Sequence, residues 1–566
     1  MQIKALSTEE LIELRSQSVN AFEYLGTAYS SLTPNDLQQL KARILNRTSQ
    51  DNLSKCLKEA ADLAVAEQKA LFIPAGLWPI QSAEVREGEG WMIDVLPGGN
   101  LLIFGEAGTH IQRLPVNQVT NTFKGAALIW IAHRPSGIVR FQNLLIDGNE
   151  STCPIDPNND AAYEHAANIK FFPQGNDDAE FEGILLHGVT MTGCVADGLN
   201  INLPTRQLLV HESECYGRTR RFRSDITLSL VPSVITDMNN FIGDSFEVES
   251  KGDPTRPAGP IRAVNKNHLI KLTNVLLRGA LDLDGKEGTL NVIGERIRQL
   301  GSTDVKINAA SFYNVRGFFS DCHFVNVDQI SKCDASFLRT KFTVYENPQI
   351  PGEAKAISIA YQQEKIVAWP SHIKFVDCHF SAVPEVTSGC YIKNAAATND
   401  VTQGASFIDC RNDKTLSHFA QVDRCGTFIF HGGILSGQSA VIGIAHGNNN
   451  YVTHIIIKDP FEWLSPLMMI NNISDSPLNK AVIGMEGKVK QDTVLATLAN
   501  PRNISPNIEW HGGFVMYLED IDDPNGRIVG IPNLKIYADR SSAISAWIYD
   551  GGANGNEIGR TSYHSL

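Results

Sequence analysis

The sequence predicts a right-handed parallel β-helix, a mainly β solenoid in which short strands stack coil upon coil. The first observation is a phrase with apolar ends and a central Asn or Asp, as in 319–324 (FSDCHF) and 375–380 (FVDCHF). The second is that copies return at irregular intervals with no helical pattern between them, which is typical of stacked strands with variable loops. An antiparallel β-sandwich would instead place turns roughly every 8–12 residues.

Helices are expected only at the N-terminus. Ser7 and Glu10 have the spacing of a capping box ahead of an apolar run. Thr33 followed by Pro34 marks a second helix start, because proline suits the first helical position. A third helix is expected over 51–68, where Leu and Ala recur on one face.

The pattern changes to strand character at 70–80 (ALFIPAGLWPI), and the Asn/Asp phrase recurs from about residue 125 to a poor copy around Asp459. We therefore predict three parts. Residues 1–68 form a helical N-terminal segment with a capping helix, and residues 69–490 form the β-helix. Residues 491–566, rich in turn residues, form a C-terminal β region for trimerisation or carbohydrate binding.

The recurring Asn or Asp is expected to turn inward at a corner of each coil. Buried amides and carboxylates need partners, so each would bond the main chain or its stacked neighbour. The clearest copies are Asn143, Asn274, Asp321, Asp377 and Asp409. The cysteines that follow three of them, Cys322, Cys378 and Cys410, are expected to stack as small interior residues and not to act as nucleophiles.

Charge and cysteine usage exclude several classes of function. The 566 residues carry a net charge of −13 and no long basic run, which argues against nucleic acid as a partner. No stretch is apolar enough to span a bilayer or to serve as a secretory signal, so membrane insertion is not expected. The ten cysteines lack zinc-ligand spacing and indicate reduced thiols. We expect neither metal nor cofactor.

Aligning the strand after each corner places polar residues in two outward columns, because strand side chains alternate between faces. The first column reads Asn200, Thr227, Glu247, Asp282, Lys306. The second reads Asn202, Ser229, Glu249, Asp284, Asn308. Four carboxylates, Glu247, Glu249, Asp282 and Asp284, thus meet on adjacent coils.

These four acids are the candidate catalytic groups. Neighbouring strands lie about 4.8 Å apart and residues two apart along a strand about 6.6 Å apart. Such separations bracket the carboxyl spacings of retaining and inverting glycosidases, roughly 5–5.5 Å and 6.5–9.5 Å. A solvated acidic patch and a calcium site remain alternatives.

Residues around this acidic quartet suit a sugar polymer. Arg218, Arg221 and Tyr216 offer guanidinium contacts to carboxylates and a ring for stacking on sugars. Lys306 could keep one acid ionised, and Asp225 is a further candidate contact. The alternatives are that the arginines only neutralise the acids, and that Asp197, Asp225 and Asp244 form the acid set. The insertion 250–268 would wall one side of the groove.

Two segments carry a family resemblance. Residues 52–80 resemble the opening of pectate-lyase-superfamily β-helix proteins, and 189–201 (VTMTGCVADGLNI) is similar to their later coils. Asp197-Gly198 resembles the first Asp-Gly of polygalacturonases, but the following paired aspartates and the Gly-His-Gly and Arg-Ile-Lys motifs are not present. The calcium-dependent pectate lyase signatures are missing too.

Within that superfamily, the helical N-terminal segment, the β-helix and the β tail look most like a bacteriophage tailspike. The resemblance implies a homotrimer in a virion tail, made in a host cytoplasm, that cleaves capsule or O-antigen with paired carboxylates. Two alternatives stay open: a lyase acting on a uronic-acid glycan, with Lys306 or an arginine as base, and a carbohydrate-binding fibre without catalysis. Acids elsewhere, such as Asp328 or Glu364, would serve a site between subunits.

Overall fold

The computed structural model forms two compact units, Met1–Asn308 (unit 1) and Ala309–Leu566 (unit 2). The structure describes residues 3–81, 91–95, 99–115, 127–133, 137–152, 167–171, 181–194, 197–201, 205–217, 226–229, 235–243, 246–249, 269–285, 289–301, 310–359, 372–394, 404–422, 426–445, 452–458, 462–463, 468–471, 480–486, 496–499, 508–511, 516–518, 534–538, 547–550, 557–560 and 564–565. Mainly β structure is confirmed, and the fold is a right-handed parallel β-helix.

The N-terminal helices of unit 1 are α1 (Thr8–Arg15), α2 (Leu25–Ala28), α3 (Pro34–Leu45) and α4 (Ser54–Ala66), with a 3-10 turn, η1, at Ala21–Tyr24. The predicted helix starts after Ser7 and Thr33 are confirmed; the helix expected over 51–68 begins at Ser54, and α2 was not predicted. Ser7 and Glu10 form the predicted capping box of α1, and Thr33 and Asp36 form one at α3. A second 3-10 turn, η3, lies at Glu150–Thr152.

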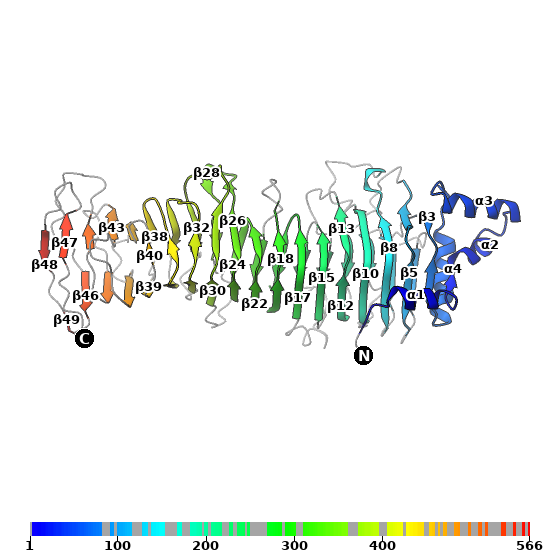
Figure 1. The fold of residues 1–566 in the computed structure, drawn as a ribbon, viewed down its shortest axis with the longest axis horizontal. Helices are drawn as coiled ribbons and strands as arrows, with labels where there is room; N and C mark the ends of the chain where they lie inside the picture. The colour runs from blue at the N-terminus through cyan, green and yellow to red at the C-terminus, as the bar shows by residue number, and fades with distance from the viewer. Residues whose placement is uncertain are drawn as a thin grey trace, which may run out of the picture. The chain divides into compact units, whose positions relative to one another are not determined.

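Unit 1 contains three ladders of parallel strands (Figure 1). The first two ladders together form the first sheet of unit 1, and the third ladder forms its second sheet. The first is β1 (Val19–Asn20), β2 (Leu71–Ile73), β5 (Leu101–Gly105), β8 (Ile138–Asp147), β10 (Phe181–Cys194), β12 (Thr205–His211), β15 (Ile235–Gly243), β17 (Leu269–Leu277) and β19 (Leu290–Glu295). The second continues the longer strands past a bend and adds β3 (Gly76–Ile80), β6 (Thr109–Arg113), β13 (Glu214–Gly217) and β20 (Arg298–Gln299). The third, called the second sheet of unit 1, is β4 (Trp91–Val95), β7 (Ala127–His133), β9 (Ala167–Phe171), β11 (Asp197–Ile201), β14 (Ile226–Ser229), β16 (Phe246–Glu249) and β18 (Leu281–Asp284).

Unit 2 repeats this arrangement. Its first sheet holds β22 (Val315–Ser320), β25 (Asp334–Leu338), β30 (His372–Val376), β33 (Gly404–Ile408), β36 (Gly426–His431), β39 (Val452–Lys458), β42 (Lys480–Glu486), β44 (Ile508–His511), β46 (Leu534–Ala538) and β49 (His564–Ser565), and past the bend β23 (His323–Val325), β26 (Lys341–Val344), β31 (His379–Ala382), β34 (Arg411–Asn412), β37 (Ile434–Leu435) and β40 (Glu462–Trp463). Its second sheet holds β21 (Ala310–Tyr313), β24 (Val327–Ser331), β29 (Ile357–Ser358), β32 (Cys390–Asn394), β35 (His418–Val422), β38 (Ala440–Ala445), β41 (Met468–Asn471) and β43 (Ala496–Ala499). Short pieces outside these sheets are β27 (Glu346–Asn347), β28 (Ile350–Ala354), β45 (Met516–Leu518), β47 (Trp547–Asp550) and β48 (Glu557–Arg560).

The recurring Asn or Asp marks a bend with positive φ. In β17, Ile270 and Leu272 are buried before the bend, and Val275 and Leu277 are buried after it. Asn274 lies between them at φ 53°. This one residue reverses the alternation, so the strand turns the corner and keeps its apolar side inside. Asn and Asp enter the left-handed region more readily than other residues with a Cβ.

The same bend stacks coil upon coil. In unit 1 the column of positive-φ residues is Asn143, Gly188, Glu212, Asn240, Asn274 and Arg296. In unit 2 it is Asp321, Arg339, Asp377, Asp409 and Gly432.

The expectation that these residues turn inward was wrong. Asn274, Asp321, Asp377 and Asp409 are exposed and Asn143 is half-buried, because the left-handed backbone points the side chain away from the core. The expected bond to a stacked neighbour forms in places: Asn274 donates to Asn240 at 2.9 Å, and Arg339 donates to both oxygens of Asp321 at 2.7 and 2.8 Å.

The interior of unit 2 is a stack of aromatic rings. The rings of Phe337, Phe375 and Phe407 follow one another at 5.4 and 5.1 Å with interplanar angles of 13° and 5°. Cys322, Cys378 and Cys410 are buried beside this stack, as predicted. Burial is the largest cause that raises the pKa of the Cys410 thiol, and the neighbouring Cys378 adds to it, so the thiol stays protonated and unreactive. All eight cysteines within the described ranges are free.

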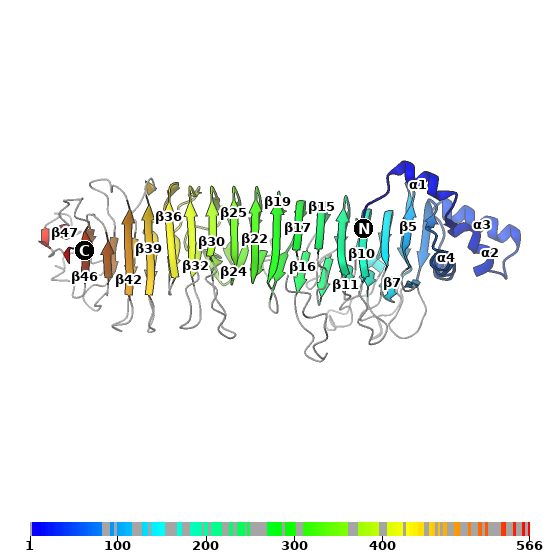
Figure 2. The same cartoon turned by 90° about the horizontal axis from the view of Figure 1, so that it is seen from below.

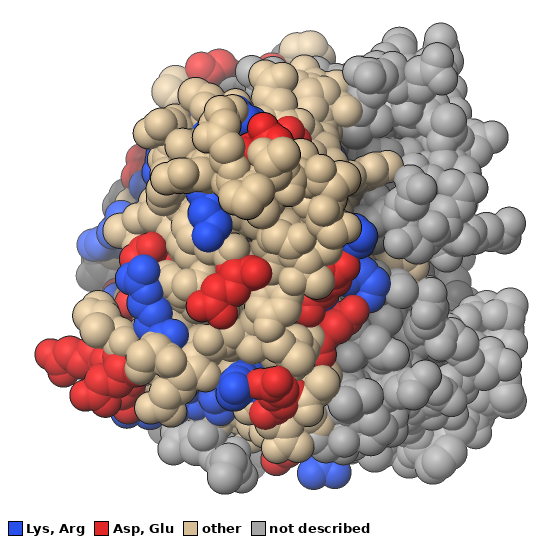
Figure 3. Space-filling view, turned by 90° about the vertical axis from the view of Figure 1, so that its right-hand side faces the viewer, with Lys and Arg blue, Asp and Glu red and all other residues tan. Residues whose placement is uncertain are grey.

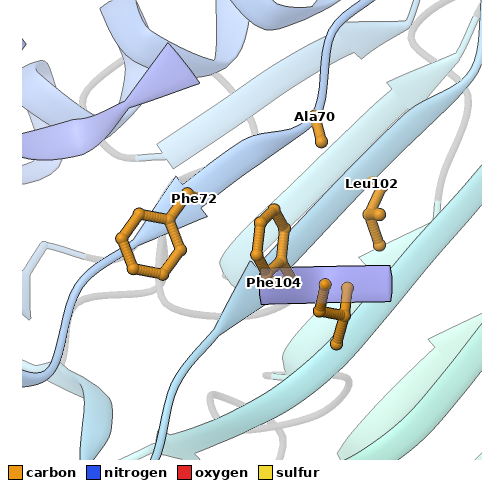
Figure 4. Packing of buried hydrophobic residues seen from close by; sticks show 5 residues of the cluster. Ala70, Phe72, Leu102 and Phe104 are labelled. Carbon is orange, nitrogen blue, oxygen red and sulfur yellow. The ribbon is translucent and has the colours of Figure 1, made fainter. Parts of the chain in front are cut away.

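The N-terminal segment lies across the outer face of the first sheet of unit 1 (Figure 2). Leu11 of α1 packs on Ala70, Phe72, Leu102 and Phe104 (Figure 4). Ile3 packs on Ile138 and Leu185. We call residues 3–15 the strap, because they run from α1 to β10 across the first sheet.

The end of unit 1 that carries the helices shows mixed charge. In Figure 3 the described basic and acidic side chains alternate over an otherwise uncharged surface. No helix in the described part of the chain is long and apolar enough to cross a membrane.

Candidate functional site on the second sheet of unit 1

The predicted register of the acidic quartet is confirmed at the level of the main chain. Glu247 of β16 pairs with Asp282 of β18, and Glu249 pairs with Asp284. Phe246, Leu281 and Leu283 are buried in the core. Asp282 and Asp284 alternate with Leu281 and Leu283 along β18 and therefore belong to its outer face. Asp282 and Asp284 are half-buried.

The first outward column continues in register toward the N-terminus. Thr227 of β14 pairs with Glu247, and Asn200 of β11 pairs with Thr227. Lys170 of β9 pairs with Asn200, and Trp130 of β7 pairs with Lys170. The column thus runs from an aromatic ring and an amine to two carboxylates on strands spaced about 4.8 Å apart.

The N-terminal half of this column is closed to solvent, which the sequence did not indicate. Asn200 was expected to face outward into water, but its side chain is fully buried and donates to Asp197 at 2.5 Å. Asp197, an alternative acid in the prediction, is also fully buried. A polar pair this deep is satisfied internally and is a poor first contact for a polymer.

Lys170 is a buried amine within the same column. Its side chain is 5% exposed, and its Nζ lies 5.8 Å from the centroid of the Trp130 ring. Burial lowers the pKa of Lys170 from 10.5 to about 8, and the attraction of Asp197 opposes that shift. The sequence reasoning missed both Lys170 and Trp130; the alternation of 127–133 and 167–171 was the signal that would have found them.

Tyr216, a predicted substrate contact, lies on β13 and pairs with an arginine that the prediction missed. The guanidinium of Arg278 lies 5.0 Å from the centroid of the Tyr216 ring. The main-chain nitrogen of Arg278 donates to the main-chain oxygen of Gly243 at 2.9 Å. Arg278 precedes β18, the strand that carries Asp282, by three residues. A cation on a ring is a suitable contact surface for a sugar.

Several predicted site residues lie outside the described ranges. They are Arg218, Arg221, Asp225 and Lys306, together with Asn202, Asn308, Asp244, Glu364 and the insertion 250–268. Asp328, the other acid considered for a site between subunits, is exposed in unit 2 and lies 3.0 Å from Lys355.

Among the described residues, no group of three or more His, Cys, Asp or Glu side chains is arranged to hold a metal ion. The arrangement can supply carboxyl groups for proton transfer and a ring with a guanidinium for sugar contacts.

Comparisons with known proteins add little beyond this geometry. No protein-family model matches the chain, and no curated protein matches it. Among solved structures the chain is similar to the tailspike protein of E. coli bacteriophage HK620, solved as a double mutant. The two share 10% sequence identity over 98% of this chain and 82% of that chain, with a TM-score of 0.32.

Proposed function

We propose that this protein binds and hydrolyses a bacterial surface polysaccharide, capsule or O-antigen, with Glu247 and Asp282 as the catalytic pair. The observation that carries the proposal is the direct main-chain pairing of these two positions on adjacent parallel strands. Two carboxyl groups held this close repel each other as anions, which favours one of them being protonated. The protonated group serves as the acid and the ionised one as the base or nucleophile.

In the proposed reaction the acid protonates the glycosidic oxygen, and the bond from that oxygen to the anomeric carbon breaks. The second carboxylate either removes a proton from an attacking water or attacks the anomeric carbon itself. In the latter case a glycosyl-enzyme ester forms, and water, deprotonated by the first group, then hydrolyses it. Glu249 and Asp284, two residues further along the same strands, are the alternative catalytic pair. Tyr216 and Arg278 are proposed as a further sugar contact. Arg218, Arg221, Asp225 and Lys306 are proposed contacts on the sequence argument alone.

The proposal includes assembly and location. We infer a homotrimer in a virion tail, which the sequence resemblance to tailspikes supports. A row of half-buried apolar residues on the outer face of the first sheet of unit 2 also favours association with further copies: Leu338, Val376 and Ile408 pair in register there.

The test replaces the two acids separately, as Glu247→Gln and Asp282→Asn, and follows the size of capsular polysaccharides by gel filtration. Each variant should lose at least about a hundredfold in depolymerisation rate, because losing a general acid or base typically costs 10²–10⁴-fold. Asp377→Asn, which removes an exposed acid in unit 2, is the control and should cleave at the parent rate.

Other outcomes separate the alternatives. Undiminished turnover in both variants would leave the quartet a solvated patch. Loss confined to Glu249→Gln and Asp284→Asn would move the active pair along the strands. Products that absorb in the ultraviolet would identify a lyase acting on a uronate. A parent protein that binds polysaccharide and leaves its length unchanged would be a binding fibre.

A further inference from the structure

The second sheet of unit 2 carries a row of polar residues in continuous register. The row, which we call the polar row, consists of Ser311, Gln329, Ser358, Lys393, Gln421 and Gly443. Six strands at about 4.8 Å give it a length of about 24 Å. One such line of groups on a rigid sheet is suited to an extended polymer.

The members of the polar row lie on the outer face. The residues beside them in each strand, among them Phe312, Ile330 and Ile392, are buried in the core. The five side chains from Ser311 to Gln421 are half-buried, and Gly443, which ends the row, is buried. Gln329 donates to the hydroxyl of Ser311 at 3.1 Å, so these groups are oriented along the row. Hydroxyl, amide and amine groups here offer both donors and acceptors.

The polar row ends against a ring. Nδ1 of His418 lies 3.2 Å from the main-chain oxygen of Ala440, to which it donates. A Cβ added to Gly443 would lie 3.0 Å from Cδ2 and Nε2 of His418 and 3.2 Å from Cε1. Because these three distances are similar, the face of the imidazole ring lies over Gly443. Only a residue without a side chain leaves room for the ring at this position. The ring therefore borders the row at Gly443.

The other outer face of unit 2 has the opposite character. There the row Leu338, Val376 and Ile408 is apolar and half-buried. One unit thus presents an apolar row on its first sheet and a polar row on its second. Burial of an apolar row against another protein surface is favourable, because it removes apolar area from water. Side chains with donors and acceptors can instead form hydrogen bonds with hydroxyl groups.

We propose that the polar row is a second glycan-binding surface, distinct from the acidic quartet, and that it binds an acidic polysaccharide along its length. Sugar hydroxyls bond the serine and glutamine side chains. An anionic substituent faces Lys393, the one charged member of the row, and a sugar ring lies near His418. This inference rests on the proposed function only in sharing its class of polymer, and it involves no bond cleavage.

The test measures binding by retention of the protein in gels that contain defined bacterial capsular polysaccharides, acidic and neutral. Lys393→Gln keeps a polar side chain and removes the charge. Lys374→Gln makes the same change at an exposed lysine of β30, on the other sheet, and is the matched control. Gly443→Val places a branched side chain against the His418 ring. Thermal unfolding of each variant checks the fold.

We expect Lys393→Gln and Gly443→Val to weaken binding of an acidic polysaccharide at least about tenfold, with Lys374→Gln at the parent affinity. Equal affinity in all variants would overturn the inference, as would a parent protein that binds only neutral polymers. The catalytic proposal is tested separately, because the Glu247→Gln and Asp282→Asn variants report chain cleavage. Parent protein that cleaves polysaccharide while Lys393→Gln binds normally would refute the polar row alone.

Discussion

The side-chain amide of Gln142 holds the main chain of Leu6 with two hydrogen bonds. Leu6 nitrogen donates to Oε1 of Gln142, and Nε2 of Gln142 donates to the oxygen of Leu6, both at 3.1 Å. Gln142 is fully buried beneath this contact. The amide thus does for the strap what a neighbouring strand does for its partner, and it fixes where the strap lies on the first sheet.

Replacing Ile3 should release the strap. Ile3→Asp removes an apolar contact with Ile138 and Leu185, and Ile3 is only 4% exposed. Burying an Ile side chain is worth about 1.5–3 kcal/mol, so we expect a loss of up to about that size in unfolding free energy. Trypsin should then cleave at Lys4 faster than in the parent. Ile12→Asp changes an isoleucine that is 67% exposed and serves as control. Equal behaviour of the two variants would contradict a docked strap.

Substitutions at Asp377 should report its backbone and not its side chain. Asp377 is exposed and has φ 51°. Asp377→Gly should be neutral or slightly stabilising, because glycine tolerates positive φ without a Cβ clash. Asp377→Ala should cost about 1 kcal/mol, because alanine has the clash and lacks a compensating polar group. Urea unfolding measures both. A larger loss for glycine than for alanine would restore the idea of an essential side-chain bond.

Lys170 should make stability depend on pH in the alkaline range. Its pKa is lowered in the fold from 10.5 to about 8, chiefly by burial. Between these values the unfolded chain binds more protons than the folded chain, so this contribution to stability rises with pH. Below about pH 8 the cost of the buried charge is present in full, and above about pH 10.5 it is gone.

Lys170→Met should therefore unfold at a higher temperature than the parent at pH 7. The gap should close as the pH rises toward 10. Lys374→Met, at an exposed lysine, should show no such convergence. A constant difference across this pH range would show that Lys170 titrates at its ordinary pKa.

Assembly is measurable without a substrate. Light scattering should give a mass close to three times the 62.1 kDa of one chain at micromolar concentration. Val376→Lys, in the apolar row of unit 2, should weaken association because it places a charge where apolar side chains are expected to meet. Asp377→Lys, at the exposed neighbour, is the control. A parent mass of one chain would defeat the homotrimer.

The fold could be predicted because its determinants repeat. The phrase around Asn274 or Asp377 records one bend and its two buried flanks, and it recurs often enough to give the register of Glu247 with Asp282. What the phrase does not encode is direction. Asn274 reads the same whether its side chain points in or out, and only the φ value decides.

Other features were out of reach because they join distant segments. Nothing near Gln142 indicates that Leu6 will lie on it, since the two are separated by 136 residues. Likewise Lys170 and Asn200 alternate as outward residues should, and their burial depends on what covers the strand. Burial of outward side chains is therefore the part of a solenoid site that local pattern predicts least well.

The shared bend has a consequence for how such a chain can vary. In unit 2 the path from Asp321 to Arg339 closes a coil with few residues. In unit 1 the path from Asn143 to Gly188 is far longer, and each path ends at a bend of its own unit with positive φ. The number of residues in a coil can thus change everywhere except at the bend. A loop can be replaced by one from another coil if the bends at its two ends are kept. The surface offered to a binding partner then changes, and the β-helix itself does not.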